Sequence, residues 1–187
     1  MSARTTLLAA AAAVALSASA HAVPINVTFN FVPTGTLTAN TGDVTTATTI
    51  TAGAPDQVTT ILANTINLIS GQSVTLQSPT PVALGNTFTK SFATSFGTFN
   101  ETLTVTLVTP GPTSLGISAV GTITGPTGFD PTPVFYSASY TQNNGPNAQI
   151  NASFNDSTVA PTVPEPASMA LLGVGMLGLS AMRRRRK

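Results

Sequence analysis

The residues that could carry chemistry in the middle of this chain are five acids and one base. Between Val23 and Val163 the sequence has no histidine, cysteine, arginine or tryptophan. A serine–histidine–aspartate triad and a cysteine–histidine pair are therefore impossible there. Paired carboxylates are the remaining catalytic material, because a glycosidase needs two of them beside one glycosidic bond. The six side chains are Lys90 and, as acids, Asp43, Asp56, Glu101, Asp130 and Asp156.

The spacing of these side chains places no two carboxylates together, so the sequence predicts a protein that is not an enzyme and uses no cofactor or metal. A secreted hydrolase that pairs Glu101 with one of the four aspartates stays open as an alternative, and it would lose activity on replacement of Glu101 or Asp130. The stretch "NNGPNAQINASFND" (143–156) offers oxygen ligands for calcium, but it lacks EF-hand spacing, and we favour a solvated loop. One base minus five acids leaves this part near −4, which excludes the basic face that nucleic-acid binding needs.

Alternating apolar and polar residues fill short stretches of the same region. The stretches "INVTFNFV" (25–32) and "ETLTVTLV" (101–108) each have a two-residue period and many β-branched residues. This pattern predicts strands with one buried face. The predicted buried faces are Ile25, Val27, Phe29 and Phe31 in the first stretch and Leu103, Val105 and Leu107 in the second.

Further strands are predicted at 45–51, 73–77, 87–99, 116–124, 134–141 and 149–154, separated by turn signals such as "TPGPT" and "TGPTG". Only residues 58–69 allow a helix, and their threonine and isoleucine content argues against it. Many short strands with frequent turns predict an all-β fold, an antiparallel β-sandwich with a jelly roll as one form of it. We place this threonine-rich domain at residues 23–160.

Threonine makes up 31 of the 141 residues from 23 to 163. Threonine suits the solvated face of a strand, which explains the count without a special function. O-glycosylation stays open, whereas ice binding would need a regular Thr-x-Thr period that the sequence lacks. Four N-x-[ST] matches also occur, and such matches arise readily by chance in a threonine-rich chain. Their asparagines are Asn26, Asn100, Asn151 and Asn155.

For two groups of aromatic residues the sequence allows either a place in the core or a place in a ligand site. Phe88, Phe92 and Phe96 share strand parity, and we predict that they belong to the core. Phe135, Tyr136 and Tyr140 could line a carbohydrate site, although the core is again the favoured interpretation.

Residues 1–22 have the three parts of a secretory signal peptide. Arg4 precedes an apolar run of about ten residues, and small residues follow, ending in Ala20-His21-Ala22. We predict a signal helix that signal peptidase removes between Ala22 and Val23. The secretion machinery would then deliver the body outside the cytoplasm.

Residues 161–187 combine a proline-rich start, an apolar run and a basic end. Pro164 and Pro166 keep the backbone extended around Glu165. The apolar run 169–182 would span roughly 21 Å as a helix at about 1.5 Å per residue, which is short for a membrane span. Basic residues beside a membrane segment stay in the cytoplasm, so they would set the topology. These residues are Arg183, Arg184, Arg185, Arg186 and Lys187.

The stretch "VPEPASMALLGVGMLGLSAMRRRRK" (163–187) resembles the PEP-CTERM sorting signal of Gram-negative bacteria, also labelled an ice-binding-protein C-terminal domain. The resemblance implies processing by exosortase, with Pro164, Glu165 and Pro166 as the recognised residues. It also implies a host that makes exopolysaccharide. The chain would be held briefly in the inner membrane by its transmembrane helix, with its C-terminus cytoplasmic. It would then reach the cell surface or the extracellular space.

Together these features predict an exported, non-catalytic protein with a structural role in the envelope or in a biofilm matrix. Exopolysaccharide is one expected partner of such a protein. The alternative is a secreted carbohydrate-binding module of the lectin type, which would need a ligand site on the body.

Overall fold

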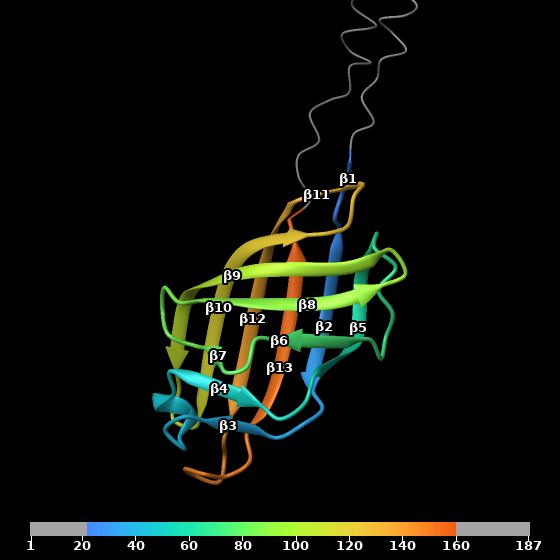
Figure 1. Ribbon diagram of the computed structural model, residues 1–187. Coiled ribbons are helices and arrows are strands. Elements are labelled where there is room, and N and C mark those ends of the chain that lie inside the picture. Colours follow the sequence, from blue (N-terminus) through green and yellow to red (C-terminus); the bar gives the residue numbers. More distant parts are fainter. Residues whose placement is uncertain (1–21, 160–187) are drawn as a thin grey trace, which may run out of the picture.

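The computed structural model describes residues 22–159, and nearly all of them lie in strands or the turns between strands (Figure 1). Within this range no helix is long and apolar enough to cross a membrane. Residues 1–21 of the predicted signal peptide and the whole predicted membrane helix of the sorting signal lie outside the described residues.

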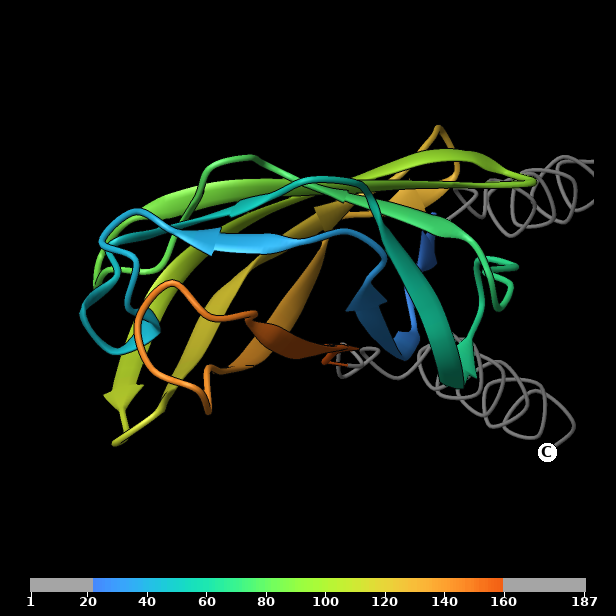
Figure 2. The same cartoon turned by 90° about the horizontal axis from the view of Figure 1, so that it is seen from below.

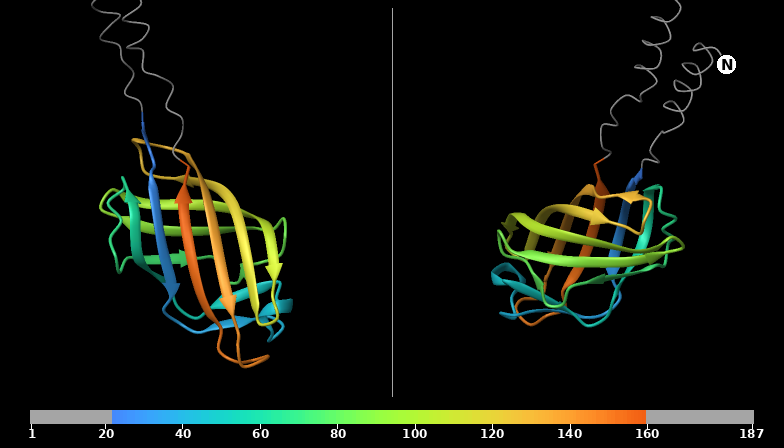
Figure 3. Two further views of the ribbon diagram at one scale, coloured as in Figure 1. Left: turned by 180° about the vertical axis from the view of Figure 1, so that it is seen from behind. Right: turned by 45° about the horizontal axis from the view of Figure 1, so that its top comes forward.

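Eight antiparallel strands form one closed barrel. Each strand pairs with the next barrel strand along the chain, and the last one returns to pair with the first (Figures 1 and 3). This arrangement is an up-and-down barrel. Its strands are β2 (Val27–Pro33), β5 (Asp56–Asn64), β6 (Ser73–Leu76), β8 (Thr87–Thr94), β9 (Gly97–Pro110), β10 (Ser114–Thr124), β12 (Thr132–Thr141) and β13 (Asn151–Thr158).

The all-β, antiparallel class predicted from the sequence is confirmed, but its arrangement differs. The sequence predicted a sandwich of two sheets, whereas the strands close into a single sheet. The alternation of apolar and polar residues indicates only that each strand has one buried face, and a sandwich and a barrel both meet that condition. Closure is decided by the pairing of β13 with β2, which no local pattern encodes.

Short elements cover the two ends of the barrel. A three-stranded sheet of β3 (Leu37–Ala39), β4 (Thr49–Ala52) and β7 (Thr80–Pro81) lies at one end, beside the 3₁₀ helix η1 (Val44–Thr46). Figure 2 views the molecule from this end. At the opposite end β1 (Val23–Pro24) runs parallel to β11 (Phe129–Asp130).

Inward-facing side chains fill the barrel, as the diameter of an eight-stranded barrel allows. All four predicted inward residues of 25–32 are buried, which confirms that face. Residues 58–69 form no helix, in agreement with the argument against one from their threonine and isoleucine content, because residues 56–64 form β5. The aromatic part of the core consists of Phe29, Phe31, Phe88, Phe92, Phe99, Tyr136, Tyr140 and Phe154.

A β-bulge in β9 changes which side chains enter the core. Opposite β10, the pairing steps from Ala119–Val105 to Ser118–Leu107, so Thr106 is the extra residue. Leu103 and Val105 are buried as predicted, whereas Leu107 is 56% exposed. The prediction that Leu107 shares their face is therefore wrong, because one extra residue reverses the alternation.

The two ends of the described chain leave from the same end of the barrel (Figure 3). The backbone N–H of Val27 donates to the hydroxyl of Thr158 at 2.9 Å, and that hydroxyl donates to the Val27 carbonyl at 3.2 Å. Beyond them, Val23 bonds to the carbonyl of Gly128 and Val159 to that of Pro133. The first and last strands are thus fastened side by side where the chain enters and leaves the barrel.

Candidate functional site

The centre of the barrel holds a lysine. Lys90 lies on β8 between two inward-facing phenylalanines, Phe88 and Phe92, and strand alternation directs all three side chains inward. The sequence carried this signal, because the parity that assigns the two phenylalanines to the core assigns Lys90 to it as well. A buried lysine is rare unless it is paired, so the neighbours of Lys90 decide its role.

Two carboxyl groups contact the Lys90 ammonium. Glu101 stands directly opposite Lys90 on the neighbouring strand β9, and its Oε2 lies 2.9 Å from Nζ. Asp156 reaches Nζ with its Oδ2 from β13, which is not a neighbour of β8 in the barrel. The side chains of all three residues are 0% exposed. The cluster therefore bridges the interior of the barrel and is sealed from solvent.

Aromatic rings surround the same nitrogen. Lys90 Nζ lies 4.9 Å from the ring centre of Phe29, 5.0 Å from that of Phe31, 5.7 Å from that of Tyr136 and 5.8 Å from that of Phe92. Ring faces attract a cation, but they cannot replace the hydration that an ammonium group loses on burial. The environment therefore disfavours charge on every member of the cluster.

The pKa directions follow from this burial. Desolvation lowers the pKa of Lys90, and attraction to Glu101 opposes that shift only in part. Desolvation raises the pKa of Glu101, against the attraction of Lys90. Both shifts favour the neutral forms, an amine and a carboxylic acid.

A third carboxyl and two tyrosines complete the interior. Burial raises the pKa of Asp56 to about 6, with Lys90 opposing the shift, and its Oδ1 has no hydrogen-bond partner among the described residues. Burial also raises the pKa of Tyr136 and of Tyr140 above the usual range of a phenol. The interior thus contains three acids and one base, so complete ionisation would leave an excess of negative charge.

The structure brings together some of the carboxyls considered from the sequence and separates others. Glu101 and Asp156 meet at Lys90, whereas Asp130 is exposed on β11 and does not join Glu101. Asp43 caps η1 by accepting from the backbone N–H of Thr45 at 2.9 Å. Within residues 22–159 no three acidic or histidine side chains are grouped to hold a metal. Because Asp156 points into the barrel, it is not part of a surface calcium loop.

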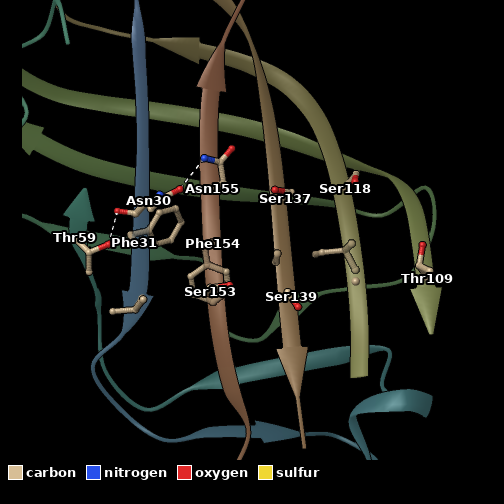
Figure 4. Close-up of a pocket in the computed structure, with 14 residues that line it drawn as sticks. Asn30, Phe31, Thr59, Thr109, Ser118, Ser137, Ser139, Ser153, Phe154 and Asn155 are labelled. Carbon is tan, nitrogen blue, oxygen red and sulfur yellow. Dashed lines mark hydrogen bonds between the residues drawn. The ribbon is translucent and has the colours of Figure 1, made fainter. Parts of the chain in front are cut away.

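The outer surface of β10, β12, β13 and β2 carries a depression of about 540 Å³ (Figure 4). Uncharged polar side chains line it, and the Asn155 amide donates to the Asn30 side-chain oxygen at 2.7 Å. Beside it, Phe135 is 53% exposed. The labelled polar residues around it are Asn30, Thr59, Thr109, Ser118, Ser137, Ser139, Ser153 and Asn155.

The aromatic residues divide differently from the sequence prediction in two places. Tyr136 and Tyr140 are buried, which confirms the core assignment and removes them as stacking surfaces for a sugar, whereas Phe135 points outward. The core prediction is right for Phe88 and Phe92 and wrong for Phe96, which is 54% exposed. Phe96 lies in the turn between β8 and β9, where strand parity ends, and packs edge-on against Phe129 at 5.6 Å.

The asparagines of the N-x-[ST] matches lie at the barrel surface. Asn26, Asn100 and Asn151 are exposed, while Asn155 is half-buried by its contact with Asn30. Surface position is necessary for glycosylation but does not distinguish it from ordinary solvated strand residues.

A family model for the PEP-CTERM protein-sorting motif matches residues 162–186. The chain carries a PEP-CTERM sorting motif. The match includes Pro164, Glu165 and Pro166, the apolar run and the four arginines, and it confirms the resemblance seen in the sequence. The PEP-CTERM motif supports an exported protein that exosortase processes.

The PEP-CTERM match covers the end of the chain and leaves the barrel outside it. No curated protein and no solved structure matches the chain. The motif residues and the basic topology residues lie outside the described residues, and their predicted roles stay predictions. The predicted signal cleavage lies between Ala22, the first described residue, and Val23, which begins β1, and it also stays a prediction.

Proposed function

We infer that this chain is an exported, non-catalytic protein with a structural role at the cell surface or in the extracellular matrix. The observation that carries the inference is the shared exit of both chain ends from one end of the barrel. The sorting motif begins at residue 162, shortly after β13 ends at Thr158. A barrel held through that end directs its opposite end and its sides outward, which suits a spacer or matrix component.

The distribution of charge supports this role. Of the six charged residues in the described part of the chain, four are buried, which leaves Asp43 and Asp130 on its surface. The rest of that surface is rich in threonine, serine and asparagine. Hydroxyl and amide groups exchange hydrogen bonds readily with the hydroxyl groups of a polysaccharide. Such a surface suits a protein embedded in exopolysaccharide.

We propose that the protein is non-catalytic because a substrate cannot reach its paired carboxyl groups. Glu101 and Asp156 lie close enough to act as a carboxyl pair, but both are sealed inside the barrel. A polysaccharide chain cannot reach them without opening the barrel. Their chemistry is therefore restricted to groups of the protein itself.

Intact mass and terminal sequencing of the protein recovered from producing cells test the sorting part of the proposal. We expect a chain that begins at Val23 and ends near Pro164–Pro166. Glu165→Ala should retain the C-terminal residues in the membrane fraction, and Ser168→Ala, outside the three recognised residues, should be processed normally. Recovery of the unaltered protein with Lys187 still attached would contradict the proposal in favour of a stable membrane anchor.

A deletion strain tests the structural part. We expect the deletion to reduce the cohesion or amount of surface matrix, and the unaltered gene to restore it. A variant with a disrupted core, such as Phe31→Ala, should be unable to restore it, because the folded barrel is the proposed working part. An unchanged matrix in the deletion strain would contradict the structural role.

A carbohydrate-binding module is the second proposal, and the depression on the outer surface favours it. Exposed Phe135 could stack on a sugar ring while Asn155 and Ser137 bond to its hydroxyls. Phe135→Ala should then abolish binding on a glycan array. Phe96→Ala removes another exposed phenylalanine away from the depression and is the matched control. No binding by the unaltered protein would leave the structural role alone.

A further inference from the structure

We propose that Lys90 and Asp156 become joined by an intramolecular amide bond between Lys90 Nζ and Asp156 Cγ, with Glu101 carrying the proton during its formation. The bond would link β8 and β13 across the interior of the barrel. It would be a covalent modification that the protein makes on itself after folding.

The placement of the three side chains supports the bond. Lys90 Nζ is in direct contact with the carboxyl of Asp156 and lies 2.9 Å from Glu101 Oε2. The three side chains come from β8, β9 and β13 and project into one closed space. Holding a nucleophile and an electrophile in contact removes most of the entropic barrier to their reaction.

The surroundings supply the protonation states that the reaction needs. An ammonium group cannot attack a carboxyl carbon, whereas a neutral amine has a free lone pair. Burial among the rings of Phe29, Phe31, Phe92 and Tyr136 penalises charge and lowers the pKa of Lys90. Transfer of one proton from the ammonium to a neighbouring carboxylate removes two buried charges at once. The cluster then contains an amine and a protonated carboxyl.

The reaction balances without an added reagent. The two carboxyls that contact Nζ share one proton, which Glu101 passes through Nζ to Asp156. The Lys90 Nζ lone pair then attacks Cγ of protonated Asp156, so a C–N bond forms and a tetrahedral intermediate results. Glu101, now the carboxylate, accepts a proton from Nζ and delivers it to the departing hydroxyl of Asp156. The C–O bond breaks and one water molecule leaves. Glu101 ends as the carboxylate, and nothing is oxidised or reduced.

Formation of the amide removes the free-energy penalty of burying charged groups in the barrel. An amide carries no charge, so the buried base and one buried acid disappear from the interior. It also closes a covalent loop from residue 90 to residue 156 and fastens the last barrel strand to the middle of the barrel. Because β13 leads toward the sorting motif, a pull on the C-terminal end of the barrel would reach a covalent link before it could peel β13 away.

Mass spectrometry of the full chain tests the bond directly. Whatever its termini after processing, the recovered protein should be lighter than its sequence by the mass of one water molecule. Fragmentation of a digest should yield a branched peptide that joins Lys90 to Asp156. The full sequence mass would overturn the proposal, as would a branch that joins Lys90 to Glu101.

Trypsin gives a second readout, because Lys90 is the only tryptic site between residues 23 and 163. Trypsin does not cleave at a lysine whose amine is in an amide bond. After full denaturation the unaltered body should resist cleavage at residue 90. Cleavage of the denatured body after Lys90 would overturn the proposal.

Variants separate the proton carrier from a structural side chain. Glu101→Gln keeps the size of the side chain but cannot accept the proton, so it should show the full sequence mass and be cleaved at Lys90. Lys90→Arg should also keep its full mass. The matched control Asp130→Asn, at an exposed carboxyl, should still lose one water. Loss of water in the Glu101→Gln variant would refute the role of Glu101.

Discussion

The buried carboxyl of Asp56 makes a quantitative prediction about stability and pH. Its pKa rises from 3.8 to about 6 on folding, because burial penalises the ionised form more than Lys90 supports it. The side chain is almost wholly buried, at 2% exposure, so solvent screens the effect little. The difference corresponds to about 3 kcal/mol of unfolding free energy.

The sign follows from proton binding. The folded state binds the Asp56 proton more tightly than the unfolded state, so protonation stabilises the fold. This contribution is complete below pH 3.8 and is lost as the pH rises through about 6. Asp56→Asn carries no titrating proton at that site. The unfolding free energy of the unaltered protein, relative to that of Asp56→Asn, should therefore fall by about 3 kcal/mol across this interval.

Urea denaturation at several pH values between about 4 and about 7 measures this difference. Subtracting the Asp56→Asn curve removes the titration of the other acids, which both proteins share. Asp130→Asn, at an exposed carboxyl, serves as the control and should follow the unaltered protein closely. Parallel pH curves for the unaltered protein and Asp56→Asn would refute the argument, as would a difference that grows toward acid.

Three further substitutions test particular contacts by urea or thermal unfolding. Leu103→Ala should lower the unfolding free energy by about 2–5 kcal/mol, because Leu103 fills the core. Leu107→Ala should lower it by less than about 0.5 kcal/mol, because the bulge turns Leu107 outward. Equal losses for the two variants would contradict the bulge. Gln142→Ala should cost about 2–4 kcal/mol, since the Gln142 amide bonds to three backbone groups, and a neutral result would contradict that role. Gly121→Ala should cost about 3 kcal/mol because its Cβ would meet the Thr102 carbonyl, and full stability would refute the close approach.

Strands and their buried faces could be predicted from the sequence because alternation is a local signal. Ile25, Val27, Phe29 and Phe31 all lie inside the barrel as that signal requires. The prediction from alternation fails where one inserted residue shifts the order of buried and exposed side chains. Thr106 reverses the face of Leu107, and a bulge leaves no mark that separates it from a continuous strand.

The interior cluster was predictable only in part. Strand parity places Lys90 with Phe88 and Phe92, so a buried base could have been inferred from the sequence. Its meeting with Asp156 could not, because β8 and β13 are not neighbours and their side chains meet only across a closed barrel. The same closure distinguishes this fold from the predicted sandwich. Local residue patterns carry little information about contacts that depend on a distant pairing.

The pairing of β13 with β2 also makes closure of the barrel depend on the last strand of the chain's folded part. Contacts such as Phe31–Phe154 join residues far apart in the chain, and such contacts form late and slowly in folding. A truncated chain that lacks β13 would leave β2 and β12 as open edges, which favour aggregation. That chain would lack the sorting motif as well, since the motif follows β13. Closure of the barrel and possession of the sorting motif thus both depend on residues that follow β12, so a chain that ends early loses both.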